Sequence, residues 1–139
     1  MIDLHSHTTA SDGEHAPAAL LALARAAGVT VLGVTDHDTV AGLQRAETAA
    51  GAEGVRFVPG IEVSATAGGR EVHVLGHFVD PGSAALRRFE DLLADKRRSR
   101  MEEMLRKLAP LGVDLTPCEV EQFSGGKTLG RPHVARAIM

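Results

Sequence analysis

The chain has 139 residues, of which 44% are hydrophobic and 24% are charged, close to the averages of globular proteins. This length fits one domain, and no apolar run approaches the ~18 residues that a membrane-spanning helix needs. The net charge of -3 excludes an overall basic surface. The chain also lacks Trp and Tyr, which usually form the aromatic platforms on which single-stranded bases stack. Any nucleic acid would therefore bind at a local site. The single cysteine, Cys118, excludes an intrachain disulfide. Together with the absence of a secretory signal pattern, it predicts a reducing, cytoplasmic location.

The first half of the chain alternates short apolar segments, typical of strands, with alanine-rich segments, typical of helices. Pro17 stands in the first turn of the first helical segment, and Gly28 follows its end. Gly68 and Gly69 mark a hairpin turn between the last two strands. Because parallel strands need crossover connections, the alternation predicts an α/β fold with a largely parallel sheet that one hairpin interrupts. The expected strands are residues 2–7, 29–34, 55–58, 61–66 and 71–79, and the expected helices are residues 17–27 and 40–50.

The second half is predicted to be helical. Apolar residues recur at helical spacing over residues 83–111, which predicts one long helix or two closely linked ones before Gly112. A Thr-Pro start predicts a short helix over residues 116–123. Residues 124–127 are expected to form a loop, which lacks the glycine spacing and the preceding strand of a nucleotide-binding P-loop. A last helix is expected from Arg131, and its pattern runs to the end of the sequence without a C-terminal cap, which predicts a truncated domain.

Residues of metal-ligand type lie near the ends of the predicted strands or in the loops that follow them. His5 and His7 point to one face of a strand because side chains alternate with a period of two, so two imidazoles can reach one ion. In parallel α/β folds the carboxyl ends of the strands gather the active-site residues. Imidazoles mixed with carboxylates suit Zn²⁺, Mn²⁺ or Fe²⁺ better than Ca²⁺, which prefers oxygen throughout. The candidate ligands are His5, His7, Asp12, His37, Glu62 and His73.

These residue types also have ordinary structural explanations. Asp12 could belong to a simple turn. Asp36 and Asp38, on either side of His37, could cap the following helix or accept hydrogen bonds that orient the imidazole. We favour the orienting role for both. His77 is interpreted as a structural histidine.

The candidate ligands lie in four groups of segments that follow one another along the chain. These are Asp3-Leu4-His5-Ser6-His7-Thr8 with Ser11-Asp12-Gly13, Thr35-Asp36-His37-Asp38-Thr39, Pro59-Gly60-Ile61-Glu62-Val63-Ser64 and Val72-His73-Val74-Leu75-Gly76. In order and spacing they resemble the motifs of the PHP (polymerase and histidinol phosphatase) family, and the resemblance covers nearly the whole chain. A further segment, Gly130-Arg131-Pro132-His133, resembles the branch that contains nucleoside 3′,5′-bisphosphate phosphatases and the RNase AM type of 5′-to-3′ exoribonuclease.

The resemblance implies a distorted (β/α)7 barrel with a metal centre at the C-terminal ends of its strands. This chain would supply the N-terminal part of that barrel, residues 1–81, and a helical insertion, residues 82–139. The implied cofactors are divalent ions, up to three in a complete domain, of Mn, Fe or Zn. The six candidate ligands would be shared among these ions: His5 and His7 on the first, Glu62 bridging it to a second ion shared with His73, and Asp12 and His37 on the third.

The resemblance also implies hydrolysis of a phosphate ester, because bound metal ions polarise phosphoryl oxygens and generate hydroxide near neutral pH. The implied substrate is a nucleotide of the 3′,5′-bisphosphate type or the 5′ end of an RNA. Arg131 and His133 become candidates for contacting a non-reacting phosphate, since the planar fork of an arginine can grip a phosphate. The alternative for Arg131 is a surface residue at a helix start. The basic run at residues 96–100 is interpreted as a solvated helix face, with a contribution to nucleotide or RNA binding left open.

The family pattern continues with further histidine ligands and an Asp-x-His pair, and none of these motifs occurs within the 139 residues of this sequence. We therefore expect a fragment of a longer enzyme; the alternative is a short protein that completes its site with a second chain. Either would cover the sheet edge that a partial barrel leaves open. The competing functions are a catalytically silent metal-binding fragment and the other family activities, histidinol-phosphate hydrolysis or a polymerase-associated exonuclease.

Overall fold

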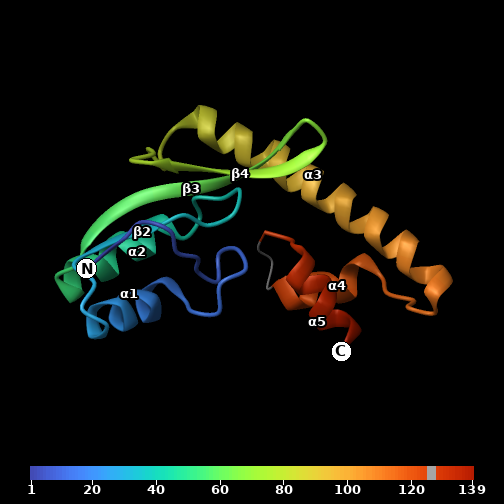
Figure 1. The fold of residues 1–139 in the computed structure, drawn as a ribbon, viewed down its shortest axis with the longest axis horizontal. Helices are drawn as coiled ribbons and strands as arrows, with labels where there is room; N and C mark the ends of the chain where they lie inside the picture. The colour runs from blue at the N-terminus through green and yellow to red at the C-terminus, as the bar shows by residue number, and fades with distance from the viewer. Residues whose placement is uncertain (125–127) are drawn as a thin grey trace.

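The structure is a computed structural model that describes residues 1–124 and 128–139. A curled sheet carries two helices on one side, and a long helix leads away from it to two short helices near the C-terminus (Figure 1). The loop predicted at 124–127 lies, beyond Ser124, outside the described residues. The strands are β1 (Ile2–Asp3), β2 (Val31–Val34), β3 (Arg56–Ala67) and β4 (Arg70–His77), and the helices are α1 (Pro17–Ala26), α2 (Leu43–Glu53), α3 (Ala84–Leu108), the 3-10 helix η1 (Ala109–Leu111), α4 (Pro117–Ser124) and α5 (Arg131–Ile138).

The sheet has the strand order β1-β2-β3-β4. β2 pairs in parallel with both β1 and β3, and β4 pairs with β3 in an antiparallel hairpin. The parallel pairing continues past the ends of the short strands, since the Thr35 amide donates to the Ser6 carbonyl at 2.9 Å. Beyond β2, the Asp38 amide donates to the Glu62 carbonyl at 2.9 Å, and the Glu62 amide donates to the Asp36 carbonyl at 3.1 Å. The segments that follow β1 and β2 are therefore held beside the middle of the sheet.

β1 is shorter than the strand predicted over residues 2–7. The side chain of Asp3 accepts a hydrogen bond from the His5 amide at 3.1 Å, which takes that amide out of the ladder. Gly33 lies so close to the backbone of Leu4 that a Cβ on it would stand 2.8 Å from the Leu4 carbonyl oxygen. The chain therefore leaves the regular pairing after Asp3 and returns to it at Ser6.

β3 is continuous where the sequence predicted a break at Pro59 and Gly60. Pro59 pairs in register with Val34 of β2. Gly60 is squeezed between its neighbours, because a Cβ there would lie 2.7 Å from Thr35 Cγ2 and 2.9 Å from the Gly76 carbonyl oxygen. The proline-glycine pair thus permits close approach of the adjacent strands, and β3 runs through it to the hairpin turn.

The hairpin turn is built as the sequence predicts. Gly68 and Gly69 have φ values of +56° and +74°, which glycine adopts without steric cost and which a two-residue hairpin of type I′ requires at both positions. The turn fixes the register, so that Ser64 stands opposite His73 and Glu62 opposite Leu75. Because strand side chains alternate between faces, the even residues of β3 and the odd residues of β4 share one face.

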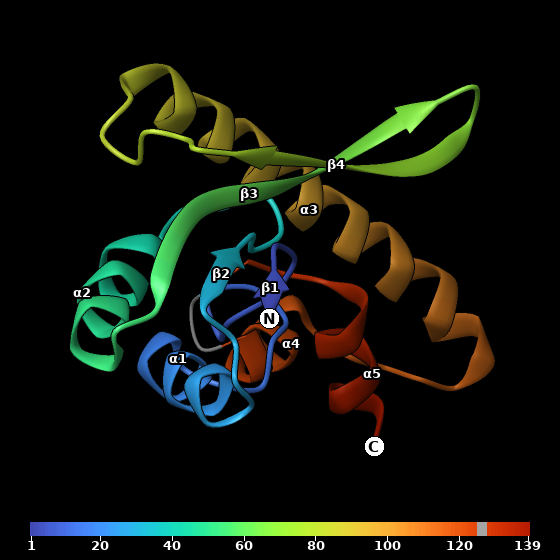
Figure 2. The same ribbon diagram turned by 60° about the vertical axis from the view of Figure 1, so that its left-hand side comes forward.

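Two apolar clusters hold the chain together. The first lies between the sheet and helices α1 and α2 and includes Leu21, Leu32 and Leu43, each at most 1% exposed. The second joins α3, α4 and α5 through side chains that include Met101 and Val120. Figure 2 shows α1 and α2 beside the parallel strands and α3 running past the hairpin.

The division into residues 1–81 and 82–139 stays a prediction, although all described strands end before α3 begins.

Helix α3 is tied to the loop between β2 and α2. Glu90 Oε1 accepts hydrogen bonds from the Val40 amide at 2.6 Å and from Thr39 Oγ1 at 3.0 Å. These contacts hold residues 39–40 in a loop, and α2 begins at Leu43 rather than at the predicted residue 40. The contact also brings α3 against the loop that carries His37.

The outer strand and the N-terminal segment expose apolar side chains. Val72, Val74 and Phe78 on and after β4 are exposed, as are Ile2 and Leu4 near β1.

Among residues 1–124 and 128–139, none of the helices has the length and apolar character needed to cross a membrane. The predicted α/β fold, with parallel strands and one hairpin, is confirmed.

Candidate metal centre

Glu62 lies at the centre of a cluster of imidazoles. Its side chain is 4% exposed, and its Oε2 lies 2.8 Å from His5 Nε2 and 3.0 Å from His7 Nε2. Its other oxygen, Oε1, lies 2.6 Å from His73 Nδ1. His37 Nδ1 is 3.6 Å from Oε2. One buried carboxylate therefore faces four histidines that come from three separate parts of the chain.

Strand geometry explains this convergence. His5 and His7 follow β1 and point to the same face, with their Nε2 atoms 3.1 Å apart. His37 follows β2 and forms a bridge with Glu62 that extends the parallel pairing. His73 on β4 shares a face with Glu62 because of the hairpin register. The structure thus brings together the histidines that the sequence placed at or after the strands.

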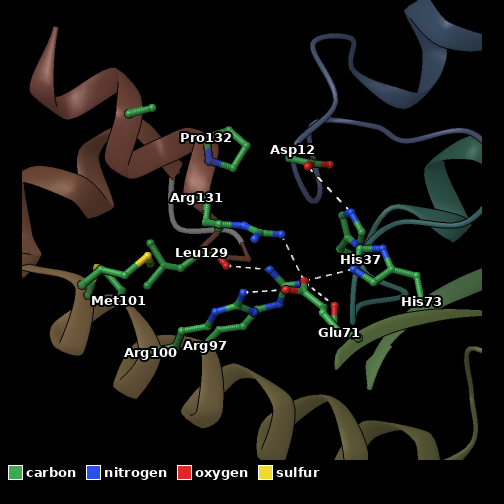
Figure 3. Close-up of a pocket in the computed structure, with 14 residues that line it drawn as sticks. Asp12, His37, Glu71, His73, Arg97, Arg100, Met101, Leu129, Arg131 and Pro132 are labelled. Carbon is green, nitrogen blue, oxygen red and sulfur yellow. Dashed lines mark hydrogen bonds and ion pairs between the residues drawn. The ribbon is translucent and has the colours of Figure 1, made fainter. Parts of the chain in front are cut away.

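Asp12 completes the cluster on its other side. Asp12 Oδ2 lies 3.8 Å from His37 Nε2, and Asp12 Oδ1 lies 3.6 Å from His7 Nδ1. Figure 3 shows Asp12 approaching His37 from the loop after β1. All six candidate ligands named from the sequence therefore meet at one place.

The donor set fits divalent cations. In the part of the chain that the structure describes, three overlapping groups offer ligand atoms that lie within 4.8 Å of one another. His37 Nδ1 is buried and has no hydrogen-bond partner among residues 1–124 and 128–139, although buried polar atoms are nearly always paired. Such an unpaired nitrogen is free to act as a ligand of a divalent cation. The three groups are His5, His7 and Glu62; His7, Asp12 and His37; and His37, Glu62 and His73.

The electrostatics of the cluster also favour cation binding. Burial lowers the pKa of His37 from its ordinary value of 6.5, which keeps the ring neutral and its lone pairs available as ligands. For Glu62, burial acts to raise the pKa, but hydrogen bonds with His5 and His73 outweigh it and lower the pKa. Glu62 therefore stays ionised among the imidazoles.

Asp36 and Asp38 hold the loops of the cluster. Asp36 is fully buried and accepts hydrogen bonds at 2.7 Å from the Thr8 amide, the Thr8 hydroxyl and the Ser11 hydroxyl. It thereby fixes the loop that carries Asp12. Asp38 accepts from the Ser64 amide at 2.7 Å. The hydrogen bonds of the two carboxylates thus go to the neighbouring loop, the strand β3 and Arg97 of α3. The role of orienting the His37 imidazole stays a prediction for both.

A cavity of about 350 Å³ opens beside the candidate ligands. Asp12, His37 and His73 lie on one side of it, and arginines from α3 and α5 lie on the other (Figure 3). Arg131, the first residue of α5, lines the cavity as the phosphate-binding prediction requires. Its partner in that prediction, His133, is 2% exposed and does not line the cavity.

His133 has a local structural task. Its Nδ1 accepts a hydrogen bond from the Gly130 amide at 3.0 Å, which satisfies a backbone donor at the start of α5. Burial lowers the pKa of the ring, so it remains the neutral acceptor that this bond requires. The phosphate-binding role of His133 stays a prediction.

Within the basic run at residues 96–100, Arg97 turns inward, whereas the other four residues are exposed, as expected of a solvated helix face. Arg97 is 17% exposed and donates to Asp38. Arg98 points away to Glu121, and Arg100 donates to Glu71 at 2.8 Å. Because residues 97 and 100 are three apart, they share a helix face, and this spacing was the signal that could have directed both toward the site.

Glu71 is the site residue that the sequence reasoning missed. Its carboxylate contacts Arg100, Arg131 at 3.1 Å and His73 Nε2 at 3.1 Å. The hydrogen bond from Arg100 is the main cause that lowers the pKa of Glu71 to about 2, and the hydrogen bond to Glu71 raises the pKa of His73. The signal was its place two residues before His73 on the same strand, which puts both side chains on one face.

Comparison with known proteins decides the family of the chain. The family model described as PHP domain matches residues 3–113. The chain belongs to the PHP domain family. The candidate ligands converge where the segments after β1 and β2 lie beside β3 and β4, and this agrees with the motifs on which the sequence resemblance was based.

Curated relatives of this PHP chain include two nucleotide-processing enzymes. A 5′-3′ exoribonuclease of Haemophilus influenzae is 37% identical over 138 residues, which cover 97% of this chain and 47% of the relative. A 3′,5′-nucleoside bisphosphate phosphatase of Chromobacterium violaceum is 36% identical over 112 residues, which cover 81% of this chain and 39% of the relative. The chain therefore spans about half the length of the curated relatives it matches.

A solved structure shows the same fold. A Chromobacterium violaceum protein described as an amidohydrolase with bound sulfate and no metal superposes with a TM-score of 0.89 at 32% identity. The match covers 99% of this PHP chain and 49% of the solved chain. The architecture described above thus corresponds to about half of a larger PHP structure.

Proposed function

We propose that this PHP chain is part of a metal-dependent phosphoesterase that hydrolyses a phosphate ester of a nucleotide or short oligonucleotide. One observation carries the proposal: a buried carboxylate, Glu62, stands among four imidazoles at the edge of a cavity lined by arginines. Nitrogen and oxygen donors can hold divalent cations, and the arginines can hold the anionic substrate beside them. The substrate class is taken from the exoribonuclease and the bisphosphate phosphatase among its relatives.

The geometry supports a division of the ligands among up to three ions of Mn, Fe or Zn. His5 and His7 direct their Nε2 atoms toward the same oxygen of Glu62, as two ligands of a shared ion would. Glu62 presents its second oxygen to His73, so this carboxylate can bridge two ions. The remaining pair, Asp12 and His37, would hold a third. Bound divalent ions would supply Lewis-acid polarisation of the phosphate ester and a source of hydroxide near neutral pH.

The arginines supply substrate binding. The donors of Arg97 are occupied by Asp38, Ser64 and the Leu129 carbonyl, so Arg97 supports the wall of the cavity. Arg100 and Arg131 are more exposed, and both reach Glu71. Their guanidinium groups can grip a phosphate that is not hydrolysed, such as the second phosphate of a nucleoside bisphosphate or the 5′ end of an RNA.

The active form is proposed to contain more protein than these 139 residues. Each of the three donor groups offers three protein atoms, and the apolar side chains near β1 and β4 are exposed. A C-terminal continuation of the chain or a second chain would add ligands and cover these edges.

The lone, exposed Cys118 is compatible with the reducing cytoplasm proposed as the location.

A catalytically silent metal-binding fragment is the competing function. The isolated chain leaves each ion short of protein ligands and open to water, which favours weak metal binding and little hydrolysis. Both functions share the ligand cluster, and they differ in whether the continued protein turns over a phosphate ester.

The test compares the 139-residue chain with the same chain continued to the length of its relatives. Metal content is measured by mass spectrometry, and hydrolysis is measured with adenosine 3′,5′-bisphosphate and with a 5′-phosphorylated RNA oligonucleotide. The proposal predicts that metal content and hydrolysis increase together in the longer protein. A longer protein that binds metal and hydrolyses neither substrate would instead support the silent fragment.

A further inference from the structure

Glu71 connects the two halves of the candidate site. It lies on β4, and its carboxylate contacts three side chains from three different elements (Figure 3). Its Oε1 is 3.1 Å from His73 Nε2 and 3.1 Å from Arg131 Nη2 on α5. Its Oε2 accepts a hydrogen bond from Arg100 Nη2 on α3 at 2.8 Å. The same carboxylate therefore contacts a candidate metal ligand and both exposed arginines of the cavity.

His73 faces a carboxylate at each ring nitrogen. Glu62 Oε1 is 2.6 Å from Nδ1, and Glu71 Oε1 is 3.1 Å from Nε2. A neutral imidazole carries one proton and can bind a cation only through its other nitrogen. If the ring is to share an ion with Glu62, Nδ1 must be free of hydrogen and the proton must stand on Nε2. Glu71 is placed to accept that proton in a hydrogen bond.

Without Glu71, the contact with Glu62 would favour the Nδ1–H tautomer of His73. Glu62 would then accept a hydrogen bond from Nδ1, and the proton would occupy the nitrogen to which a cation must bind. Histidines that ligate metals usually donate their second ring N–H to a carboxylate or a carbonyl, and loss of that acceptor weakens metal binding. Glu71 is the acceptor that meets this requirement for His73.

The arginines fix the position of Glu71 in turn. A glutamate on the outer strand of a hairpin has several rotamers, and ordering them costs conformational entropy. Arg100 and Arg131 hold one oxygen each, so the carboxylate stays beside His73. The arginines that we propose to bind substrate phosphate therefore also hold the carboxylate that supports the metal ligand His73.

We propose that Glu71 is a positioning residue that holds the ring proton of His73 on Nε2 and thereby links the arginine pair of the cavity to metal binding. This inference rests on the proposed function, because it takes His73 as a metal ligand. It assigns to Glu71 a task that requires both a hydrogen-bond acceptor and a fixed place between the two arginines.

The first experiment reads the tautomer of His73 directly. Nitrogen NMR of the metal-free chain is recorded at increasing pH until the His73 signals no longer change, so that the neutral ring is observed. The wild-type chain is expected to carry the Nε2–H form, and Glu71→Ala is expected to shift the ring to the Nδ1–H form. Glu71→Gln keeps an acceptor oxygen and is expected to retain the Nε2–H form. Unchanged tautomers in Glu71→Ala would overturn the proposal.

The second experiment measures affinity for Mn²⁺ alone by electron paramagnetic resonance. Glu71→Ala is expected to weaken binding roughly 10- to 100-fold, the usual effect of losing a carboxylate that supports a metal ligand. Glu71→Gln should weaken Mn²⁺ binding less than Glu71→Ala does. The double variant Arg100→Ala with Arg131→Ala should also weaken Mn²⁺ binding, by a smaller factor than Glu71→Ala. Glu103→Gln is the matched control, since Glu103 is an exposed carboxylate paired with Lys107.

His73→Ala separates the two proposals. Unchanged Mn²⁺ binding in His73→Ala would contradict the proposed ligand set, whatever Glu71 does. Weakened binding in His73→Ala with wild-type binding in Glu71→Ala would leave the proposed function standing and overturn the inference about Glu71. Circular dichroism of each variant, together with the conservative Glu71→Gln, distinguishes a lost hydrogen bond from a misfolded chain.

Discussion

Arg97 and Asp38 form an ion pair that joins helix α3 to the loop after β2. Arg97 Nε donates to Asp38 Oδ2 at 2.6 Å, and the two side chains are 17% and 2% exposed. The other donors of the guanidinium reach the Leu129 carbonyl at 2.8 Å and Ser64 Oγ at 2.9 Å. A single arginine therefore fastens the helical half of the chain to the strands that carry the candidate ligands.

Removing this arginine should destabilise the chain strongly. Arg97→Ala leaves the buried carboxylate of Asp38 without its partner, and loss of one member of a buried pair costs about 3 to 5 kcal/mol. Arg98→Ala is the control, because the pair of Arg98 with Glu121 is largely exposed and such pairs contribute less than about 1 kcal/mol. Urea unfolding measures both free energies. Equal losses in the two variants would show that the Arg97 pair has no special structural role.

Gly60 should not tolerate a side chain. In Gly60→Ala the new Cβ would meet Thr35 Cγ2 at 2.7 Å and the Gly76 carbonyl oxygen at 2.9 Å, so adjacent strands must separate, at a cost of about 1 to 3 kcal/mol. Gly51 lies in helix α2, and no atom of the described part of the chain would lie within 4 Å of a Cβ there. Gly51→Ala should therefore stabilise the chain by roughly 0.5 to 1 kcal/mol. Thermal unfolding of the two variants checks the opposite signs. Similar melting temperatures would contradict the close packing around β3.

The stability of the metal-free chain should depend on pH through His37. Burial lowers the pKa of His37 in the folded chain below its ordinary value of 6.5, so the unfolded state binds more protons between these two values. Stability therefore rises with pH across that window. The contribution of the neutral ring is present above pH 6.5 and is lost as the pH falls through the lower, folded pKa.

The measurement is the free energy of unfolding of wild type and His37→Gln from pH 7.5 downward in a chelator. The variant is expected to lose less stability than wild type over this range, because it has no buried ring to charge. His15→Gln, which replaces an exposed histidine, should follow the wild-type curve. A His37→Gln curve parallel to wild type would contradict the burial effect.

The fold could be predicted largely from the sequence because its periodicities are local. Alanine-rich segments between β-branched segments indicate helices and parallel strands, and the pair Gly68 and Gly69 indicates the hairpin. Strand ends and the length of β3 could not be predicted, because they depend on tertiary contacts. Asp3 binds the His5 amide, and Gly60 accommodates neighbours that are distant in sequence.

The candidate site shows the same limit. The histidines could be predicted because strand alternation and strand ends place them together. Glu71 could not be singled out, since its importance comes from Arg100 on α3 and Arg131 on α5, whose positions depend on how the helices pack. The roles of Asp36 and Asp38 likewise depend on loops that only the folded chain brings near them.

The metal content of three variants tests the central claim that Glu62 organises the metal centre. Wild type, Glu62→Ala, His5→Ala and His73→Ala are dialysed to equilibrium against a buffer that contains Mn²⁺, and the metal bound above the buffer level is measured by mass spectrometry, with circular dichroism as a check of folding. Because Glu62 faces His5 through one oxygen and His73 through the other, its loss should remove a ligand from two ions at once. The account predicts that Glu62→Ala retains less metal than either histidine variant. Equal metal content in all three variants would contradict it.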